Sequence, residues 1–331
     1  MDWNRKSWKK VDQGRLERED FDAGPTNLDE IEPGLWIGNL TAATDLEELA
    51  KIHCNYILTV DSCPLPRNIS LLPGIKTMFI QVTDMNKEDL LSHFESAFEF
   101  IEEARENGVV LVHCYFGVSR SSTIVIAYLM KKFKISYDEA FERAKSKRKF
   151  VSPNAGFESQ LRLYEKMGFT IDKTFLHYRL FKLNVAAAKV MQVKILPIEH
   201  MDVVKDDPAL ITVKPDPLVY RCIKCRRVVA CVSNLLPHVR GRRMSWKKLE
   251  PSDSQEFCTL IYFIEPIAWM KSAMHSEQGK LNCPKCNSKL GSFSWTMGCQ
   301  CPCGSKVSPA FYLVPSKVEW SNFVKNVQVT L

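Results

Sequence analysis

The sequence predicts an α/β domain with a mostly parallel central sheet, followed by a small β-rich domain that binds zinc. In the first half of the chain, short apolar strands alternate with amphipathic helices, the pattern of a sheet covered by helices. Nine of the 12 cysteines lie between Cys222 and Cys303. The net charge is −3 over residues 1–180 and +10 over residues 181–331. These changes in pattern, cysteine content and charge indicate two different domains.

The composition suits a folded protein that works in a reducing compartment. At 331 residues, 45% of them hydrophobic, the chain is long enough for two ordinary domains. It has no run of about 18 apolar residues, and its first residues lack the apolar core of a signal peptide. We therefore expect no membrane partner and a location in the nucleus and cytoplasm, where cysteines serve purposes other than disulfides.

The first domain begins after a polar stretch without any period, which predicts a disordered or loosely docked arm. The next elements are expected in the following order: a strand entering a turn at 34–40, a short helix at 45–52, buried strands at 56–60 and 76–82, and an amphipathic helix at 88–106 that ends at Gly108. Residues 109–112 form a buried strand and residues 122–133 a buried helix. Ser136 and Glu139 then form a capping box, and Asn154 caps a last helix through Met167.

A tight loop joins the strand at 109–112 to the helix at 122–133. Such a turn aims backbone N–H groups and the positive end of the helix dipole into one concavity, which suits a phosphate. This field favours the thiolate form of Cys114, and Arg120 can hold two phosphate oxygens as a planar fork. The predicted phosphate-binding residues are Tyr115, Phe116, Gly117, Val118, Ser119 and Arg120.

A thiolate that attacks phosphorus needs an acid to protonate the departing oxygen. Asp84 is the preferred candidate because it follows a strand and precedes Cys114 by 30 residues. Glu88 and Asp89 lie nearby, but they open the predicted helix at 88–106, where acidic residues suit the helix dipole.

The run from His113 and Cys114 to Arg120 and Ser121 resembles the signature of the cysteine-dependent phosphatases, in their dual-specificity branch. Further landmarks are Gly38-Asn39, Val82-Thr-Asp84 and Pro153-Asn-Ala-Gly-Phe157. The resemblance implies the α/β phosphatase fold and hydrolysis of phosphotyrosine and phosphoserine/threonine through a cysteinyl phosphate, without a cofactor. It implies that Cys114 is the nucleophile, Arg120 the phosphate clamp and Asp84 the acid and then the base. It further implies that Ser121 donates to the departing sulfur, and that His113 orients the loop. The alternative is a structural cysteine beside a core histidine.

The loop interior favours phosphoprotein substrates. Family members that act on inositol lipids commonly carry lysines inside this loop, and Tyr115 to Ser119 include none. RNA 5′-triphosphatases share the scaffold and remain an alternative. A basic run follows at Arg143, Lys145, Lys147, Arg148 and Lys149, either to flank acidic substrates or as a solvated helix face.

The cysteine-rich half contains two C-x2-C knuckles, each of which can bring two thiolates to one zinc ion. These are Cys222 with Cys225, and Cys283 with Cys286. We expect His238 and Cys258 to join the first knuckle, and Cys301 and Cys303 to join the second. An interleaved pairing, with both knuckles on one metal, stays open. Cys231 and Cys299 are spare, although Cys299 can replace Cys301.

The second half extends the resemblance to those dual-specificity phosphatases that carry a C-terminal zinc-binding domain. The matching segments include Tyr220-Arg-Cys, 262–266, 290–295 and 308–311. The resemblance implies that the zinc domain assists assembly of the large ribosomal subunit by helping to exchange a stalk-assembly factor, without need of the phosphatase site. Basic residues around Trp246 can meet RNA phosphates while the indole stacks on a base, or they form a solvated face. These are Arg226, Arg227, Arg240, Arg242, Arg243, Lys247 and Lys248.

The expected partners are therefore phosphoprotein substrates and precursors of the large ribosomal subunit or their RNA. The predicted boundaries are an arm at 1–26, a phosphatase domain at 27–172, a connecting segment and linker at 173–219, and a zinc-binding domain at 220–331.

Overall fold

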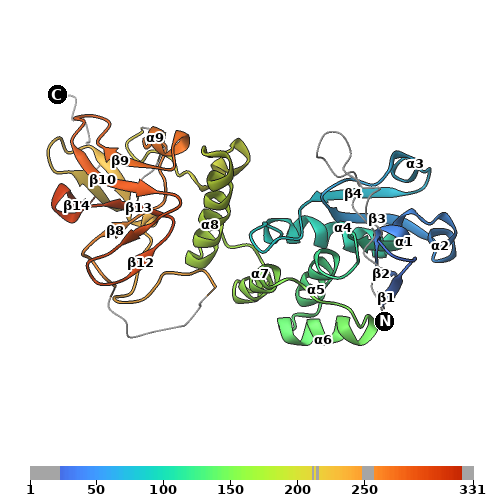
Figure 1. Ribbon diagram of the computed structural model, residues 1–331. Coiled ribbons are helices and arrows are strands. Elements are labelled where there is room, and N and C mark those ends of the chain that lie inside the picture. The colour runs from blue at the N-terminus through green and yellow to red at the C-terminus, as the bar shows by residue number, and fades with distance from the viewer. Residues whose placement is uncertain (1–22, 211, 214–215, 248–256, 323–331) are drawn as a thin grey trace, which may run out of the picture. The chain divides into compact units, whose positions relative to one another are not determined.

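The computed structural model describes residues 23–210, 212–213, 216–247 and 257–322. The chain divides into two compact units, Met1–Thr170 and Ile171–Leu331, which are coloured blue to green and yellow to red in Figure 1. Among the described residues, no helix has both the length and the apolar character needed to cross a membrane.

The first unit contains a five-stranded sheet in the order β1-β2-β5-β3-β4. Its strands are β1 (Leu28–Glu32), β2 (Leu35–Gly38), β3 (Cys54–Asp61), β4 (Lys76–Gln81) and β5 (Val109–His113). Strand β1 runs antiparallel to β2, and the other neighbouring pairs are parallel. The predicted α/β fold with a mostly parallel sheet is confirmed.

Helices cover this sheet, as Figure 1 shows. They are α1 (Leu40–Thr44), α2 (Leu46–Lys51), α3 (Arg67–Ser70), α4 (Phe94–Asn107), α5 (Arg120–Phe133), α6 (Tyr137–Lys147) and α7 (Ala155–Lys166). One core cluster joins Leu49 of α2 and Ile69 of α3 to Ile57 and Leu111 of the sheet. Helix α5 contacts β2, β3 and β5 as well as α4, α6 and α7, so it is the central helix of the unit.

Local capping explains where several helices begin. Ser136 and Glu139 form the predicted capping box of α6, and Asn154 caps α7 by accepting from Gly156 N and Phe157 N. The helix predicted from residue 88 begins only at Phe94, after a 3₁₀ turn at Leu91–His93. Gln160 Oε1, from α7, accepts from the backbone N–H groups of residues 90 and 91, so a distant side chain caps the start of this turn.

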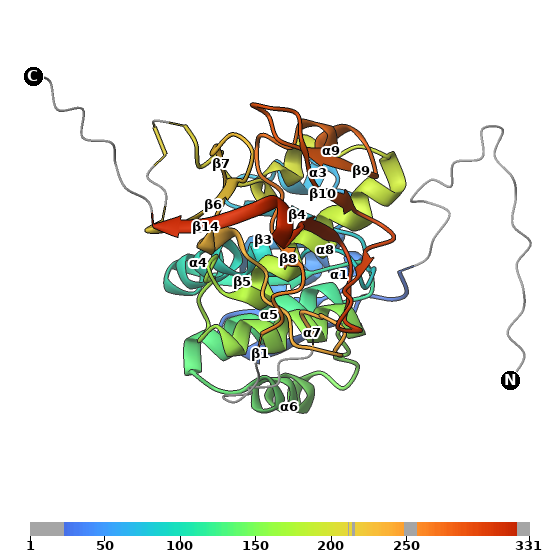
Figure 2. The same cartoon turned by 90° about the vertical axis from the view of Figure 1, so that its left-hand side faces the viewer.

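The second unit is rich in antiparallel β structure. Its sheets have the orders β8-β13-β10-β9, β14-β6-β7 and β11-β12, and Figure 2 shows β14 in red beside β6. The strands are β6 (Leu218–Cys222), β7 (Val228–Cys231), β8 (Tyr262–Phe263), β9 (Gln278–Asn282), β10 (Lys289–Ser294), β11 (Cys299–Gln300), β12 (Lys306–Val307), β13 (Ala310–Leu313) and β14 (Val318–Asn322). The helices are α8 (Leu176–Val193) and α9 (Lys271–His275), with 3₁₀ turns at Ile198–Val203, Val232–Asn234 and Pro315–Lys317.

Two segments outside the predicted domains make contacts within the units. Helix α8 lies in the stretch expected to connect the domains, yet Arg179 donates to Glu265 Oε2 at 2.6 Å and the Phe181 ring lies 4.9 Å from that of Trp246. The helix is therefore part of the second unit. In the first unit, Thr41 Oγ1 donates to the carbonyl of Gly24 at 2.8 Å, so the end of the expected arm is docked. The rest of the arm lies outside the described residues.

Candidate active site and metal centres

The candidate catalytic residues meet at one edge of the first sheet. Strands β3, β4 and β5 are parallel, so their carboxyl ends lie at the same edge, where α/β proteins form their sites. Cys114 directly follows β5, Asp61 ends β3, and Asp84 stands three residues beyond the last residue of β4. Residues far apart in the sequence are thereby brought beside the Cys114 loop.

The loop from Cys114 to Arg120 is held open by contacts to its outward-facing carbonyls. Tyr115 O accepts from Leu40 N at 3.1 Å, and Val118 O accepts from Ser152 N at 3.0 Å. Gly117 O accepts from Arg148 Nε at 2.9 Å. In each peptide unit the N–H and C=O groups point in opposite directions. Carbonyls that bond to groups outside the loop therefore leave the adjacent N–H groups facing into it. Gly117 N, for example, donates to Cys114 Sγ at 3.2 Å. The arrangement is an anion cradle.

Gly117 has a positive φ of +70° that a residue with a side chain rarely adopts. A Cβ there would lie 2.6 Å from the Gly38 carbonyl oxygen and 2.7 Å from Arg148 Nη2. Gly117 is one of the predicted phosphate-binding residues, and its close neighbours are another turn of the chain and a buried arginine.

Cys114 and its neighbours are enclosed. The Cys114 side chain is 1% exposed, and its Sγ lies 3.2 Å from Ser121 Oγ. His113 is fully buried, and its Nε2 lies 2.8 Å from Thr59 Oγ1 of β3. This contact ties the end of β5 to its neighbouring strand, which suits a residue that orients the loop.

Arg120 is the first residue of α5 and is 6% exposed. Its Nη1 donates to Asp61 Oδ1 at 2.7 Å and to the Val82 carbonyl at 3.3 Å. Its Nε is buried and has no hydrogen-bond partner among the described residues. The guanidinium therefore keeps unsatisfied donor capacity beside the cradle, as an empty phosphate clamp requires.

The Asp84 carboxyl lies at the rim of the same loop. Its Oδ1 accepts from Ser119 Oγ and from Asn154 Nδ2, both at 2.7 Å. Both contacts fall on one oxygen, so Oδ2 is left without a hydrogen bond among the described residues. Ser119, predicted as a phosphate-binding residue, uses its hydroxyl to hold the candidate acid.

The sequence-based reasoning missed three residues of this site. Arg148 was placed in a basic run along a helix, yet it is 1% exposed and bridges Gly117 O to Asp29 Oδ2. Asn154 was predicted only as a cap. Asp61 was not singled out, although an acidic residue that ends a buried strand in a parallel sheet is itself a signal of a site.

A thiol at the end of a parallel strand, an amide cradle and an arginine at a helix N-terminus define a cysteine-dependent phosphatase. The family model of the dual specificity phosphatase catalytic domain matches residues 35–167. The chain is 42% identical to dual specificity protein phosphatase MPK-4 of Drosophila melanogaster, over 98% of this chain and 95% of the relative. It belongs to the dual-specificity protein phosphatase family and is an enzyme of that class.

Other relatives match both halves of the chain. Human dual specificity protein phosphatase 12 is 36% identical over 88% of this chain and 87% of its own length. Tyrosine-protein phosphatase YVH1 of Saccharomyces cerevisiae is 28% identical over 86% and 89%. Among solved structures, human DUSP28 is 34% identical, with a TM-score of 0.40 over 44% of this chain and 96% of that chain.

Eight cysteine and histidine side chains form two clusters in the second unit. The first cluster joins Cys222, Cys225, Cys283 and Cys286, and the second joins His238, Cys258, Cys301 and Cys303. All eight predicted ligands are thus gathered. The expected pairing is wrong, because the two knuckles share one cluster and His238 and Cys258 join the C-x-C pair. The interleaved alternative is the one found.

The geometry of both clusters fits zinc. Tetrahedral zinc with Zn–S distances of about 2.3 Å requires sulfurs about 3.8 Å apart. In the first cluster the Cys222 and Cys286 sulfurs are separated by 3.7 Å and those of Cys225 and Cys283 by 3.5 Å. In the second, the Cys258 and Cys301 sulfurs are 3.7 Å apart and Cys303 Sγ lies 3.5 Å from His238 Nε2.

The turns around these ligands share one backbone feature. The residue after the last cysteine of each knuckle or C-x-C pair has a positive φ, +62° at Arg226, +57° at Asn287 and +91° at Gly304. Cys231 and Cys299 lie in neither cluster. Burial raises the pKa of the Cys231 thiol, as expected of a spare core cysteine.

The predicted base-stacking role of Trp246 is wrong, because the indole is 8% exposed and packs edge-on against Phe181. Lys248 lies outside the described residues. Arg226 pairs with Glu319 and Arg227 with Asp207. Arg226, Arg240, Arg242, Arg243 and Lys247 are exposed, and Arg227 is half-buried. The basic surface is therefore narrower than the sequence predicts.

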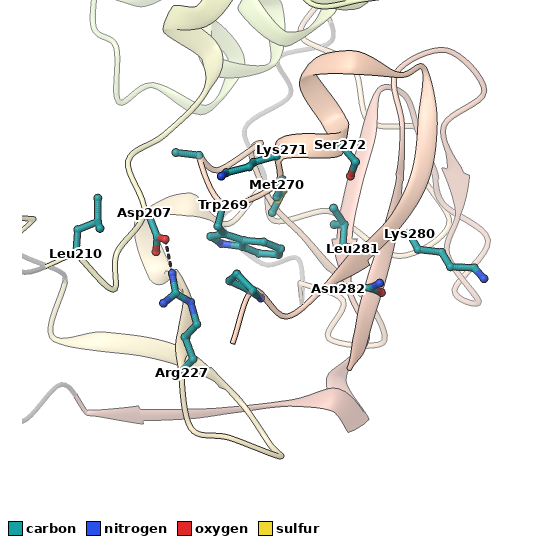
Figure 3. Close-up of a pocket in the computed structure, with 12 residues that line it drawn as sticks. Asp207, Leu210, Arg227, Trp269, Met270, Lys271, Ser272, Lys280, Leu281 and Asn282 are labelled. Atoms are coloured by element: carbon teal, nitrogen blue, oxygen red, sulfur yellow. Dashed lines mark hydrogen bonds and ion pairs between the residues drawn. The ribbon is translucent and has the colours of Figure 1, made fainter. Parts of the chain in front are cut away.

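The second unit also contains a cavity of about 800 Å³, shown in Figure 3. Trp269 lies across it, and the Arg227–Asp207 ion pair forms one wall. The Trp269 Nε1 donates to the Val229 carbonyl at 2.8 Å, which fixes the ring. Residues of the catalytic loop do not line this cavity.

Proposed function

We propose that Cys114 is the nucleophile of a protein phosphatase that acts on phosphotyrosine and phosphoserine/threonine. The amide cradle and the helix dipole favour the thiolate and bind the phosphate oxygens, and Arg120 clamps two of them. The thiolate attacks phosphorus, the bond to the leaving oxygen breaks, and that oxygen takes a proton from Asp84. Since Ser119 and Asn154 both donate to Oδ1, the transferable proton sits on Oδ2.

The second step hydrolyses the cysteinyl phosphate. The Asp84 carboxylate, now deprotonated, removes a proton from the attacking water, and the sulfur leaves as a thiolate. Ser121 Oγ, 3.2 Å from the sulfur, is placed to donate to it as negative charge returns. The backbone donor Gly117 N contacts the same sulfur. All groups that these two steps need come from the first unit.

The observation that carries this proposal is the cradle of inward amides around a buried thiol, with the unsatisfied Arg120 Nε beside it. Cys114→Ser is expected to lower turnover of p-nitrophenyl phosphate by at least about 10⁴-fold, because the hydroxyl is a far weaker nucleophile. Cys54→Ser is the matched control, since burial raises the pKa of that thiol to about 11 and it lies in the core. Turnover retained by Cys114→Ser contradicts the assignment. Phosphotyrosine and phosphothreonine peptides test dual specificity.

We further propose that each of the two Cys/His clusters holds one structural zinc ion. The support is the ligand set, thiolates with one imidazole, and separations that match tetrahedral zinc. When bound, zinc would cross-link the turns that carry these ligands. In the first cluster, the Ser288 hydroxyl lowers the pKa of the Cys286 thiol to about 6, which favours the thiolate that a metal requires.

We propose a second role for the zinc unit, in assembly of the large ribosomal subunit, in which it contacts the precursor particle or its RNA. The support is the resemblance of both halves to zinc-containing dual-specificity phosphatases and the exposed basic residues at 240–247. Such a role places the protein in both nucleus and cytoplasm, which a fluorescent fusion tests directly.

Complementation separates the two roles. In cells that lack the native protein, the Cys114→Ser chain is expected to restore large-subunit levels, and a chain truncated near residue 217 is expected to fail. The opposite result, rescue by the truncated chain alone, contradicts the ribosomal role and leaves a phosphatase whose metal unit only stabilises it.

A further inference from the structure

Asp61 is a buried acidic residue within the phosphate site. It ends β3 and is 4% exposed. A carboxylate beside a phosphate cradle opposes anion binding, because like charges repel more strongly where water is excluded. Its Oδ1 nevertheless accepts from Arg120 Nη1 at 2.7 Å and from the backbone N–H of Ser62 at 2.7 Å. Because the Asp61 carboxylate repels the phosphate that the site binds, we look for a contribution that offsets this repulsion.

The contact determines which edge of the guanidinium is left for a ligand. Guanidinium donors lie in one rigid plane, so fixing one nitrogen fixes the directions of the others. Asp61 and the Val82 carbonyl occupy Nη1. The Nε–Nη2 edge is the one that can bind two phosphate oxygens side by side, and Nε is buried without a partner among the described residues.

Asp61 also contacts the segment that carries the candidate acid. Its backbone carbonyl accepts from Val82 N at 3.1 Å, and Val82 precedes Asp84 by two residues. Asp61, at the end of β3, thus contacts both the segment that leads to Asp84 and the guanidinium of Arg120, the proposed phosphate clamp.

We infer that Asp61 is a positioning residue of the phosphatase reaction. It holds Arg120 by Nη1 so that the Nε–Nη2 edge faces the phosphate, and it keeps the clamp in register with the Asp84 segment. This inference rests on the proposed function of Arg120 as the clamp. The other possible role is that of a plain counter-charge for a buried arginine. The two roles predict opposite effects of removing the Asp61 carboxylate on the affinity for phosphate. If Asp61 is only a counter-charge, its loss makes the site more positive and strengthens binding. If it orients Arg120, its loss misplaces the guanidinium and weakens binding.

The test uses the full chain and two probes, p-nitrophenyl phosphate as substrate and inorganic phosphate as competitive inhibitor. Asp61→Ala is expected to lower kcat/KM by about 10- to 100-fold, as a misplacement of about 1 Å does, and to weaken inhibition by phosphate. Asp61→Asn keeps an accepting oxygen and is expected to lose about 3- to 10-fold. Glu32→Gln removes another ion pair of this unit, that with Arg143, and is expected to leave both values unchanged.

A double variant tests whether Asp61 acts through the guanidinium. In an Arg120→Lys background there is no fork to orient, so adding Asp61→Ala should change the affinity for inorganic phosphate by less than about twofold. The inference is overturned if Asp61→Ala keeps wild-type kcat/KM, binds phosphate equally or more tightly, or has the same effect in both backgrounds. If Asp61→Ala does not fold, an unchanged kcat/KM in Asp61→Asn overturns it. Wild-type activity in Arg120→Lys alone refutes the clamp and leaves the zinc assignment intact.

Discussion

Three cysteines of this chain differ in chemistry because they have different neighbours. Burial raises the pKa of the Cys54 thiol to about 11, so it remains an inert part of the core. The Cys286 thiol is exposed and accepts from Ser288, which lowers its pKa to about 6. Cys114 is as buried as Cys54 but lies against Gly117 N and Ser121 Oγ. The two buried thiols therefore differ in the groups that contact their sulfur atoms.

Asn154 has two roles that substitution can separate. Its Oδ1 caps α7 while its Nδ2 donates to Asp84. Asn154→Asp keeps an N-cap oxygen but replaces the donor by a repelling carboxylate. We expect this variant to retain the melting temperature and to lower kcat about 10-fold, with a larger loss on alkyl phosphates than on p-nitrophenyl phosphate, because poor leaving groups depend most on the acid.

The matched control is Ser136→Ala, which removes the cap of α6 far from Asp84. It is expected to lower the free energy of unfolding by about 1 kcal/mol and to leave kcat unchanged. Equal losses on alkyl and aryl phosphates in Asn154→Asp would show that this residue does not act through the acid.

The Cys114 loop is an element whose shape depends on its surroundings. Its conformation is set by the first residue of α1 and by the segment between α6 and α7, through Leu40 N, Arg148 and Ser152 N. The N-terminal turn of α5 continues the loop directly, since the helix begins at Arg120 rather than at residue 122 as the sequence predicts. Arg120 therefore takes its orientation from a regular helix on one side and from Asp61 on the other.

Substitutions at two glycines with nearly equal φ allow the effects of backbone strain and of steric clash to be measured separately. Gly117→Ala places a Cβ 2.6 Å from the Gly38 carbonyl, whereas Gly168, with φ +71°, has nothing within 4 Å of such an atom. Both substitutions cost about 1 kcal/mol of left-handed strain. Only Gly117→Ala should also distort the loop and lower kcat/KM by more than about 10-fold. Normal activity in Gly117→Ala would show that the loop can shift without harm.

At the scale of the whole molecule, the chain divides its chemistry between two units. All eight ligands of the two clusters belong to the second unit, and the candidate catalytic residues all belong to the first. We expect a zinc chelator to unfold the second unit while p-nitrophenyl phosphate hydrolysis continues, because structural zinc contributes folding free energy only where it binds. Circular dichroism and activity measured on the same sample check this. Loss of activity in parallel with zinc would contradict it.

The pairing of the knuckles makes a second prediction at this scale. Cys225 and Cys283 belong to the same cluster, so the double variant Cys225→Ser/Cys283→Ser should lose one zinc ion and keep the other. Under the pairing expected from the sequence, each substitution would disrupt a different site and both ions would be lost. Metal content per chain, measured by mass spectrometry, distinguishes the two outcomes. Cys231→Ser is the control and should retain both ions.

Features that lie within one short segment could be predicted from the sequence. The strand–loop–helix turn around Cys114, the caps at Ser136 and Asn154 and the two C-x2-C knuckles depend on residues a few positions apart. Alternation of apolar segments predicted the parallel sheet, because helices must cover both of its faces. The predicted start of the helix before Gly108 was wrong by several residues, because the side chain that caps this region, Gln160, comes from a distant helix.

By itself, the sequence determined the class of chemistry, because a thiol, a turn of amides and an arginine within one loop suffice to bind and attack a phosphate. Only the tertiary structure decided which knuckles share a cluster, that Arg148 is buried beneath the loop, and that Asp61 holds Arg120. The reason is that these contacts join residues 31 to 64 positions apart in the sequence, and packing rather than local spacing determines which of them meet.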